Sequence, residues 1–196
     1  MRRIFRKRRS VTELIEYYKG IFTILSSCAS RQLEEVTFRR TVIPVQELLD
    51  AAGKYFKKLM KNRPERIELE IEPMEAKVIG DVNQLRFLLE NLIDEALTVR
   101  EDGVIRLQAR KDNEYIRFLF TDTRREKSVE ELNQLFYPNL ARMTSGEKGE
   151  LRGTEYLVCK QIIRDHDEFA GRRGCRINAE PAEGGGFTVY FTIPRR

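Results

Sequence analysis

The sequence has few of the residues that metal and redox chemistry require. It contains no tryptophan and one histidine, His166, and its three cysteines are Cys28, Cys159 and Cys175. The cysteines form no CxxC pair, and none lies at zinc-ligand spacing from the histidine. Because an odd number of cysteines cannot all pair internally, we expect buried, reduced thiols in a cytosolic protein. These absences exclude a disulfide framework and argue against a zinc site.

Long apolar runs are also missing. No stretch is apolar enough over a sufficient length to span a bilayer, and the charged start is not followed by the apolar core of a signal peptide. The apolar share of 41% is nevertheless ordinary for a folded protein. The length of 196 residues suits one domain with an appendage.

Positive charge is concentrated at the start of the chain. Residues 2–9 contain six arginines and lysines and no acid, so subtracting these six from the net charge of +5 leaves the remainder at −1. The body is therefore not a basic platform, and we expect no specific nucleic-acid partner. The basic start has three interpretations: a juxtamembrane flank that faces the membrane surface, a contact with nucleic acid, or a solvated helix start.

Helical periodicity dominates the first half of the chain. Over residues 11–39 apolar positions alternate three and four residues apart, which predicts one long helix with a seam for another helix or a second copy of the chain. Pro44 ends this run, and residues 45–60 form a second amphipathic pattern. The clearest helix covers residues 81–97, with Asp81 in the N-cap position.

Alternation of apolar and polar residues predicts strands in much of the remainder. The predicted strands cover residues 66–71, 77–79, 104–110, 115–121, 176–179 and 187–193. Shorter helices are expected at 129–136 and 155–166, a hairpin loop at 111–114, and a mobile loop without periodicity at 139–152. Helices and a mixed sheet would then form separate layers, so we expect an α+β fold, a two-layer α/β sandwich preceded by a long helix.

The helix over 81–97 resembles the first helix of the ATP-binding domain of sensor histidine kinases. The family's NLL-x-NA box is matched by Asn91-Leu92-Ile93-Asp94-Glu95-Ala96. In that family the asparagine before the alanine ligates Mg²⁺, and the resemblance places Glu95 there. A gyrase-like reading of the same stretch makes Asn91 the ligand instead and puts Phe87 where gyrase has its catalytic glutamate. Glu95 and Asn91 are therefore the candidate Mg²⁺ ligands, since Mg²⁺ prefers hard oxygen ligands.

A second box of the family, D-x-G-x-G, is matched by Phe120-Thr121-Asp122-Thr123-Arg124-Arg125-Glu126. Asp122 corresponds to the aspartate that accepts a hydrogen bond from the adenine amino group. The two glycine positions hold Arg124 and Glu126. Glycine leaves room for a ligand close to the backbone, so we expect these two long side chains to fill that room.

A third box, the phosphate-binding G-x-G-L-G-L turn, is matched by Leu151-Arg152-Gly153-Thr154-Glu155-Tyr156. Gly153 is kept, and Glu155 introduces an anion where phosphate would lie. The helix that follows resembles that of the family and ends at His166, a position that implies packing. Histidine kinases phosphorylate a histidine on their first dimerisation helix, and no such histidine is present in these 196 residues.

The resemblance implies three parts: a basic flank over 1–10, a dimerisation-type helix over 11–40, and a histidine-kinase-like ATPase domain over 41–196. Its apolar positions match the family, whereas most nucleotide-specifying positions do not. We therefore expect a degenerate ATPase domain in two-component signalling, with weak or no binding of ATP and Mg²⁺, that acts as a dimerisation or interaction module. The vestigial ATP site would consist of Asn91, Glu95, Asp122 and Gly153.

The sequence leaves two alternatives open. The chain is an active kinase domain that binds ATP and Mg²⁺ and phosphorylates a histidine elsewhere, or it is a non-catalytic binder of anionic partners through residues 2–9. The expected partners are a second copy through the helix over 11–40, a response regulator, and upstream sensor domains. The expected location is the cytoplasm, as the cytosolic part of a membrane-linked sensor.

Overall fold

The structure is a computed structural model that describes residues 38–137, 144–145, 151–152 and 155–196. The chain divides into two compact units, of which the first comprises Met1–Thr37 and Asn139–Thr154. The described part of this first unit is a pair of two-residue antiparallel strands, β6 (Thr144–Ser145) and β7 (Leu151–Arg152). The dimerisation-type helix predicted over 11–40 lies outside the described residues as far as residue 37, and Phe38 to Arg40 are not helical.

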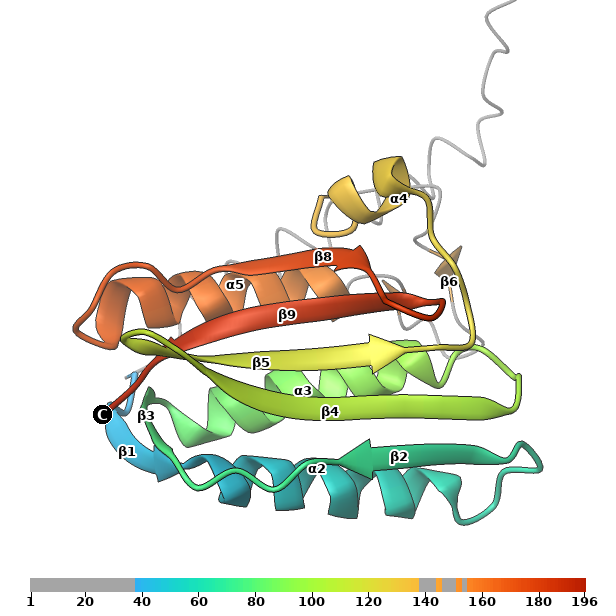
Figure 1. Cartoon of the computed structure of the whole chain (residues 1–196), viewed down its shortest axis with the longest axis horizontal. Helices are drawn as coiled ribbons and strands as arrows, with labels where there is room; N and C mark the ends of the chain where they lie inside the picture. The colour runs from blue at the N-terminus through green and yellow to red at the C-terminus, as the bar shows by residue number, and fades with distance from the viewer. Residues whose placement is uncertain (1–37, 138–143, 146–150, 153–154) are drawn as a thin grey trace, which may run out of the picture. The chain divides into compact units, whose positions relative to one another are not determined.

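The second unit, Phe38–Pro138 with Glu155–Arg196, is built on a five-stranded sheet in the order β2-β4-β5-β9-β8 (Figure 1). Its strands are β2 (Ile67–Ile71), β4 (Gly103–Asp112), β5 (Tyr115–Asp122), β8 (Ile177–Pro181) and β9 (Phe187–Pro194). β2 and β4 run parallel, and the other neighbours are antiparallel. A further antiparallel pair joins β1 (Thr41–Pro44) to β3 (Lys77–Gly80).

Helices cover one face of this sheet. The long helices are α2 (Val45–Met60), α3 (Val82–Ala96) and α5 (Glu155–Phe169), and α4 (Val129–Asn133) is short. Along β5 every second side chain is buried, because alternate residues of a strand point to the covered face. In the core, the rings of Phe118 and Phe191 stack with centroids 4.8 Å apart. The predicted two-layer α+β sandwich is confirmed. Among the described residues, no helix combines the length and apolarity needed to cross a membrane.

Some predicted boundaries are wrong. Asp112 pairs with Tyr115, so the β4–β5 hairpin turns over two residues rather than over 111–114. Asn113 adopts φ 52°, a left-handed conformation that asparagine tolerates better than most residues. α4 stops at Asn133 and α5 continues to Phe169, three residues beyond the predicted end. The strand β1 is not predicted from the sequence, because four residues with one buried side chain give no clear alternation.

The N-terminus of α3 is capped as predicted. Oδ1 of Asp81 accepts hydrogen bonds from the backbone N–H groups of Asn83 (2.9 Å) and Gln84 (3.1 Å). Its Oδ2 accepts from the backbone N–H of Arg39 at 2.8 Å. One carboxylate therefore satisfies two free donors of the helix and also anchors the segment that enters the domain.

His166 packs directly behind this cap. Its Nε2 accepts from the backbone N–H of Asp81 at 3.1 Å, and its Nδ1 lies 2.8 Å from the carbonyl oxygen of Ile162. These partners require a neutral ring with the proton on Nδ1. Burial lowers the pKa of His166 below its ordinary value of 6.5. The histidine thus has the packing role expected from the sequence. Cys159 is buried, with its Sγ 3.6 Å from the carbonyl oxygen of Leu88, and Cys175 is partly buried; neither is in a disulfide, and Cys28 lies outside the described residues.

Candidate functional site

The candidate site lies where the C-terminal end of α3 meets the C-terminal end of β5. α3 supplies Asn91 and, one turn later, Glu95, while Asp122 is the last residue of β5. The alternation of β5 directs Asp122 to the helix-covered face, where its side chain is 1% exposed. Three of the four predicted site residues therefore belong to the elements expected for them. The fourth, Gly153, lies outside the described residues.

Asp122 is held by the arginine that occupies the first glycine position. Nε of Arg124 lies 2.9 Å from Oδ1 of Asp122, and its Nη2 lies 2.9 Å from Oδ2. The backbone N–H of Arg124 also donates to Oδ1, at 3.1 Å. Both carboxylate oxygens therefore accept from one guanidinium, in the bidentate geometry that gives the strongest charge-assisted hydrogen bonds. Like that of Asp122, the side chain of Arg124 is only 1% exposed.

Arg124 also closes the end of α3. Its Nη2 donates to the carbonyl oxygen of Ala96 at 2.7 Å, and its Nη1 lies within 3.5 Å of the carbonyl oxygens of Val99 and Glu101. The last carbonyl groups of a helix have no partner within the helix and carry its negative partial charge. The buried guanidinium of Arg124 donates hydrogen bonds to these carbonyl groups, and its positive charge offsets their negative partial charge. Its aliphatic stem crosses Gly103, where an added Cβ would lie 2.6 Å from Cγ of Arg124.

A second arginine bridges the two candidate carboxylates. Nη2 of Arg125 lies 3.4 Å from Oε1 of Glu95, and its Nε lies 3.4 Å from Oδ2 of Asp122. Its guanidinium also lies 5.5 Å from the ring centroid of Phe187. Glu95, Asp122, Arg124 and Arg125 thus form one ion-pair network, which we call the α3–β5 network. The D-x-G-x-G motif does not single out Arg125, because the motif allows any residue at that position.

Burial controls the protonation of this region. Burial raises the pKa of Glu95, and although the charges of Arg125 and Lys127 oppose the shift, that of Glu155 adds to it. Tyr156, beside Glu155 at the start of α5, is buried and packs edge-to-face on Phe136. Its pKa lies well above the ordinary value because of burial, with the charge of Glu95 adding to the effect. The predicted anion Glu155 is therefore close enough to Glu95 for the two charges to interact.

The remaining predicted residues are used differently. The side-chain amide nitrogen of Asn91 donates to the carbonyl oxygen of Phe87 within α3, at 2.6 Å. Glu126 is exposed, and its carboxylate approaches the Gly184–Gly186 turn, where an added Cβ on Gly185 would lie 3.9 Å from it. The expectation that Glu126 fills the space beside Asp122 is therefore wrong, and Arg124 and Arg125 are the side chains that lie there. Within the described ranges, no three histidine, cysteine or acidic side chains are grouped as metal ligands.

The fold is that of the catalytic domains of sensor histidine kinases. The nucleotide-free catalytic domain of histidine kinase ThkA superposes with a TM-score of 0.63 at 20% identity, covering 80% of this chain and 96% of that one. The mycobacterial sensor histidine kinase MprB gives 0.61 at 18% identity, covering 80% and 98%. ThkA in complex with the response regulator TrrA gives 0.62 at 18% identity, covering 97% and 53%. No curated protein sequence matches the chain.

A family model shows the family of the chain. The model described as histidine kinase-, DNA gyrase B- and HSP90-like ATPase matches residues 80–196, more than half of the chain. The chain therefore belongs to this ATPase family. The matched range begins at Gly80, just before α3, and includes Glu95, Asp122 and the whole α3–β5 network.

Proposed function

We propose that this protein is a histidine-kinase-type ATPase domain of two-component signalling in which the chain's own side chains close the nucleotide site. It binds ATP and Mg²⁺ weakly or not at all and acts through its interactions rather than through phosphoryl transfer. The domain comprises residues 41–196. We propose that the basic flank over 1–10 and a dimerisation helix within 11–40, which ends before Phe38, precede it.

The observation that supports this proposal is the buried Asp122–Arg124 pair, with both side chains 1% exposed. In the family, the aspartate of this box accepts from the adenine amino group. Here an adenine would have to displace a guanidinium that also binds the carbonyl oxygen of Ala96. A neutral amino group cannot replace that charge, and separating a buried ion pair costs about 3–5 kcal/mol.

The phosphate and magnesium side of the site fits no better. Glu95 pairs with Arg125, and the charge of Glu155 already acts on it. A triphosphate would add further negative charge next to these two carboxylates, and a bound Mg²⁺ would compete with Arg125 for Glu95. The amide of Asn91 is engaged with the backbone of α3. These residues do not fit the nucleotide and its metal.

Isothermal titration with ATP and Mg²⁺ tests the proposal. We expect no measurable heat of binding for the natural chain. A double variant, Arg124→Gly with Glu126→Gly, restores the two glycines of the family. A triple variant adds Asp122→Leu to these two changes and so lacks the adenine acceptor. Micromolar binding by the natural chain contradicts the proposal, and binding by the double-glycine variant that Asp122→Leu abolishes supports it.

An active kinase domain is the second candidate. Its support is that Asp122 and Glu95 lie together at the position where the family binds nucleotide, bridged by Arg125. This candidate predicts transfer of labelled γ-phosphate from ATP to a supplied dimerisation domain, and loss of that transfer in Asp122→Asn. No labelling of any supplied dimerisation domain counts against it.

The proposed partners are a second copy of the chain, through the helix over 11–40, and a response regulator. The solved complex of histidine kinase ThkA with the response regulator TrrA supports the second class of partner. Sedimentation analysis over a range of concentrations tests dimerisation. A concentration-independent monomer contradicts it. Titration with response-regulator receiver domains tests the other partner.

A further inference from the structure

A cluster of basic side chains lies at the end of the domain where the chain enters and leaves it. This basic end surface consists of Arg39, Arg40, Lys77, Lys111, Arg172, Arg173, Arg176, Arg195 and Arg196. Eight of these nine residues are exposed and Arg195 is partly exposed. The acidic residues within and next to the same segments are Glu75, Asp81, Asp112, Glu114, Asp165, Asp167 and Glu168. Positive charges therefore outnumber negative ones nine to seven.

Tertiary contacts bring these residues together from distant parts of the sequence. The backbone N–H of Arg195 donates to the carbonyl oxygen of Glu114 at 2.9 Å, and that of Arg196 donates to the carbonyl oxygen of Lys77 at 3.0 Å. Arg172 forms an ion pair with Glu114. In Figure 1 the β4–β5 hairpin, β1, the end of α5 and the C-terminus all lie at the left end of the sheet.

The hairpin also holds the loop that follows α5. The hydroxyl of Tyr115 donates to the carbonyl oxygen of Arg173, and the guanidinium of Arg40 packs on Gly171, where an added Cβ would lie 2.6 Å from it. This longer connection replaces the family's tight turn and contributes Arg172 and Arg173 to the surface.

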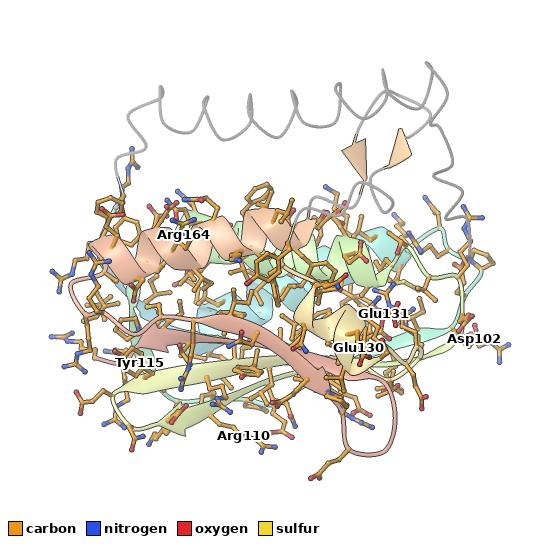
Figure 2. The ribbon with its side chains drawn as sticks, turned by 90° about the horizontal axis from the view of Figure 1, so that it is seen from above. Asp102, Arg110, Tyr115, Glu130, Glu131 and Arg164 are labelled. Carbon is orange, nitrogen blue, oxygen red and sulfur yellow. The ribbon has the colours of Figure 1, made fainter. Side chains whose placement is uncertain are left out.

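The charge is local rather than a property of the whole chain. Without residues 1–10 the chain carries a net charge of −1, since these hold six of the positive charges behind the total of +5. Figure 2 shows the acidic residues Asp102, Glu130 and Glu131 at the end of the domain opposite Tyr115. The basic end surface lies where residue 38 joins the domain, whereas the opposite end carries both acidic residues and the exposed Arg66 and Arg100 beside Asp102.

An aromatic ring lies next to these charges. Phe169, in the last turn of α5, is 50% exposed, and its centroid lies 5.9 Å from that of Phe38. Exposed rings next to lysine and arginine side chains are typical of surfaces that lie against lipid headgroups, where the ring inserts and the charges meet phosphate. A duplex presents its phosphodiester backbone outward and has no apolar layer to receive the ring, so this combination favours a membrane over duplex nucleic acid.

We propose that the basic end surface binds an anionic phospholipid membrane and orients the domain with its α3–β5 network facing away from the bilayer. Each lysine or arginine close to an anionic leaflet adds to the attraction, which weakens as salt screens it. This binding site is separate from the candidate nucleotide site and does not depend on the proposed function.

Vesicle sedimentation with the full chain tests this proposal. Vesicles of phosphatidylcholine with about one third phosphatidylserine are compared with vesicles of pure phosphatidylcholine. Low salt is used because the negative surface potential of the anionic vesicles is then least screened. The test variant is Lys77→Glu, Lys111→Glu, Arg176→Glu and Arg196→Glu together. The matched control reverses four exposed charges elsewhere: Lys57→Glu, Lys58→Glu, Lys61→Glu and Arg100→Glu. Thermal unfolding confirms that both are folded.

We expect the test variant to bind anionic vesicles on the order of a hundredfold more weakly, whereas the control stays close to the natural chain. An equal loss in both variants overturns the proposal, because net charge alone then explains binding. A variant with residues 2–9 neutralised separates the basic flank: if it loses all binding while the test variant loses none, the proposal is also overturned. Tighter binding to duplex DNA than to vesicles, lost in the same test variant, assigns the surface to nucleic acid instead.

Discussion

The two ends of α3 each hold a buried polar cluster, and the clusters differ in kind. At the N-terminus, the carboxylate of Asp81 and the neutral ring of His166 accept hydrogen bonds from backbone N–H groups. At the C-terminus, the α3–β5 network joins four charged side chains. The backbone donors of the first cluster are present whatever the neighbouring side chains are, whereas each charge of the network needs another side chain as its partner. A substitution of a neighbouring residue can therefore remove a partner from the second cluster but not a backbone donor from the first.

The largest expected effect comes from breaking the C-terminal cluster. Arg124→Met leaves the buried Asp122 with only the longer contact to Arg125 and frees the carbonyl groups at the end of α3, so we expect a loss of about 3–5 kcal/mol in the free energy of unfolding. Urea denaturation measures it. The control is the double variant Arg124→Met with Asp122→Leu, which removes both charges and should recover most of the loss. A single-variant loss below about 1 kcal/mol contradicts the proposed burial of this pair.

Breaking the N-terminal cluster should cost less. Asp81→Ala removes the cap of α3 and the acceptor of the Arg39 N–H, and we expect a loss of about 2 kcal/mol in the free energy of unfolding. Asp81→Asn keeps one side-chain oxygen for the cap and should lose about half as much. If Asp81→Ala proves more destabilising than Arg124→Met, the ranking of the two clusters is reversed.

The pH dependence of stability should distinguish the two clusters by sign. The folded pKa of His166 is lowered below 6.5, so the unfolded state takes up more protons. Its contribution to stability is complete above pH 6.5 and decreases as the pH falls below that value, by at most about 1.4 kcal/mol per pH unit. Denaturation with guanidinium chloride at several pH values between 7.5 and 5 measures this decrease in the free energy of unfolding. In His166→Gln this acid-side slope should disappear, and an unchanged slope would exclude the histidine as its source.

Glu95 should produce a smaller effect with the opposite sign. Its folded pKa is raised above 4.5, so the folded state takes up more protons, and stability decreases as the pH rises from 4.5 through the folded pKa. Glu95→Gln should remove this loss and leave the protein at pH 7 slightly more stable, by less than about 1 kcal/mol. Thermal unfolding at pH 7 detects the gain. Destabilisation instead would show that the contact with Arg125 outweighs the burial of the carboxylate.

Local signals were sufficient for most of the fold. The apolar face of α3 and its Asp81 cap depend on residues within one or two turns of each other, and the capping hydrogen bonds confirm them. The strands of the mixed sheet were likewise visible in their alternation. The shortest elements, such as β1, were missed because their pairing with a distant strand, rather than their own pattern, makes them strands.

Only part of the candidate site could be predicted from the sequence. Family motifs pointed to Glu95 and Asp122, and residue type alone suggested that Arg124 would occupy space. The direction of each long side chain was not available, so Glu126 was placed wrongly and the bridge from Arg125 to Glu95 was missed. Those two residues are 30 positions apart and meet only when α3 packs beside the end of β5.

What the sequence determined by itself is the framework: the order of helices and strands, the core-facing positions, and the cap at the start of α3. These depend on periodicity and on contacts between near neighbours, which are written directly in the chain. Tertiary structure alone decided that Arg124 folds back onto Asp122, that His166 supports Asp81 from 85 residues away, and that nine basic residues gather at one end. Long, flexible charged side chains have many directions open to them, and only the packed neighbours select one.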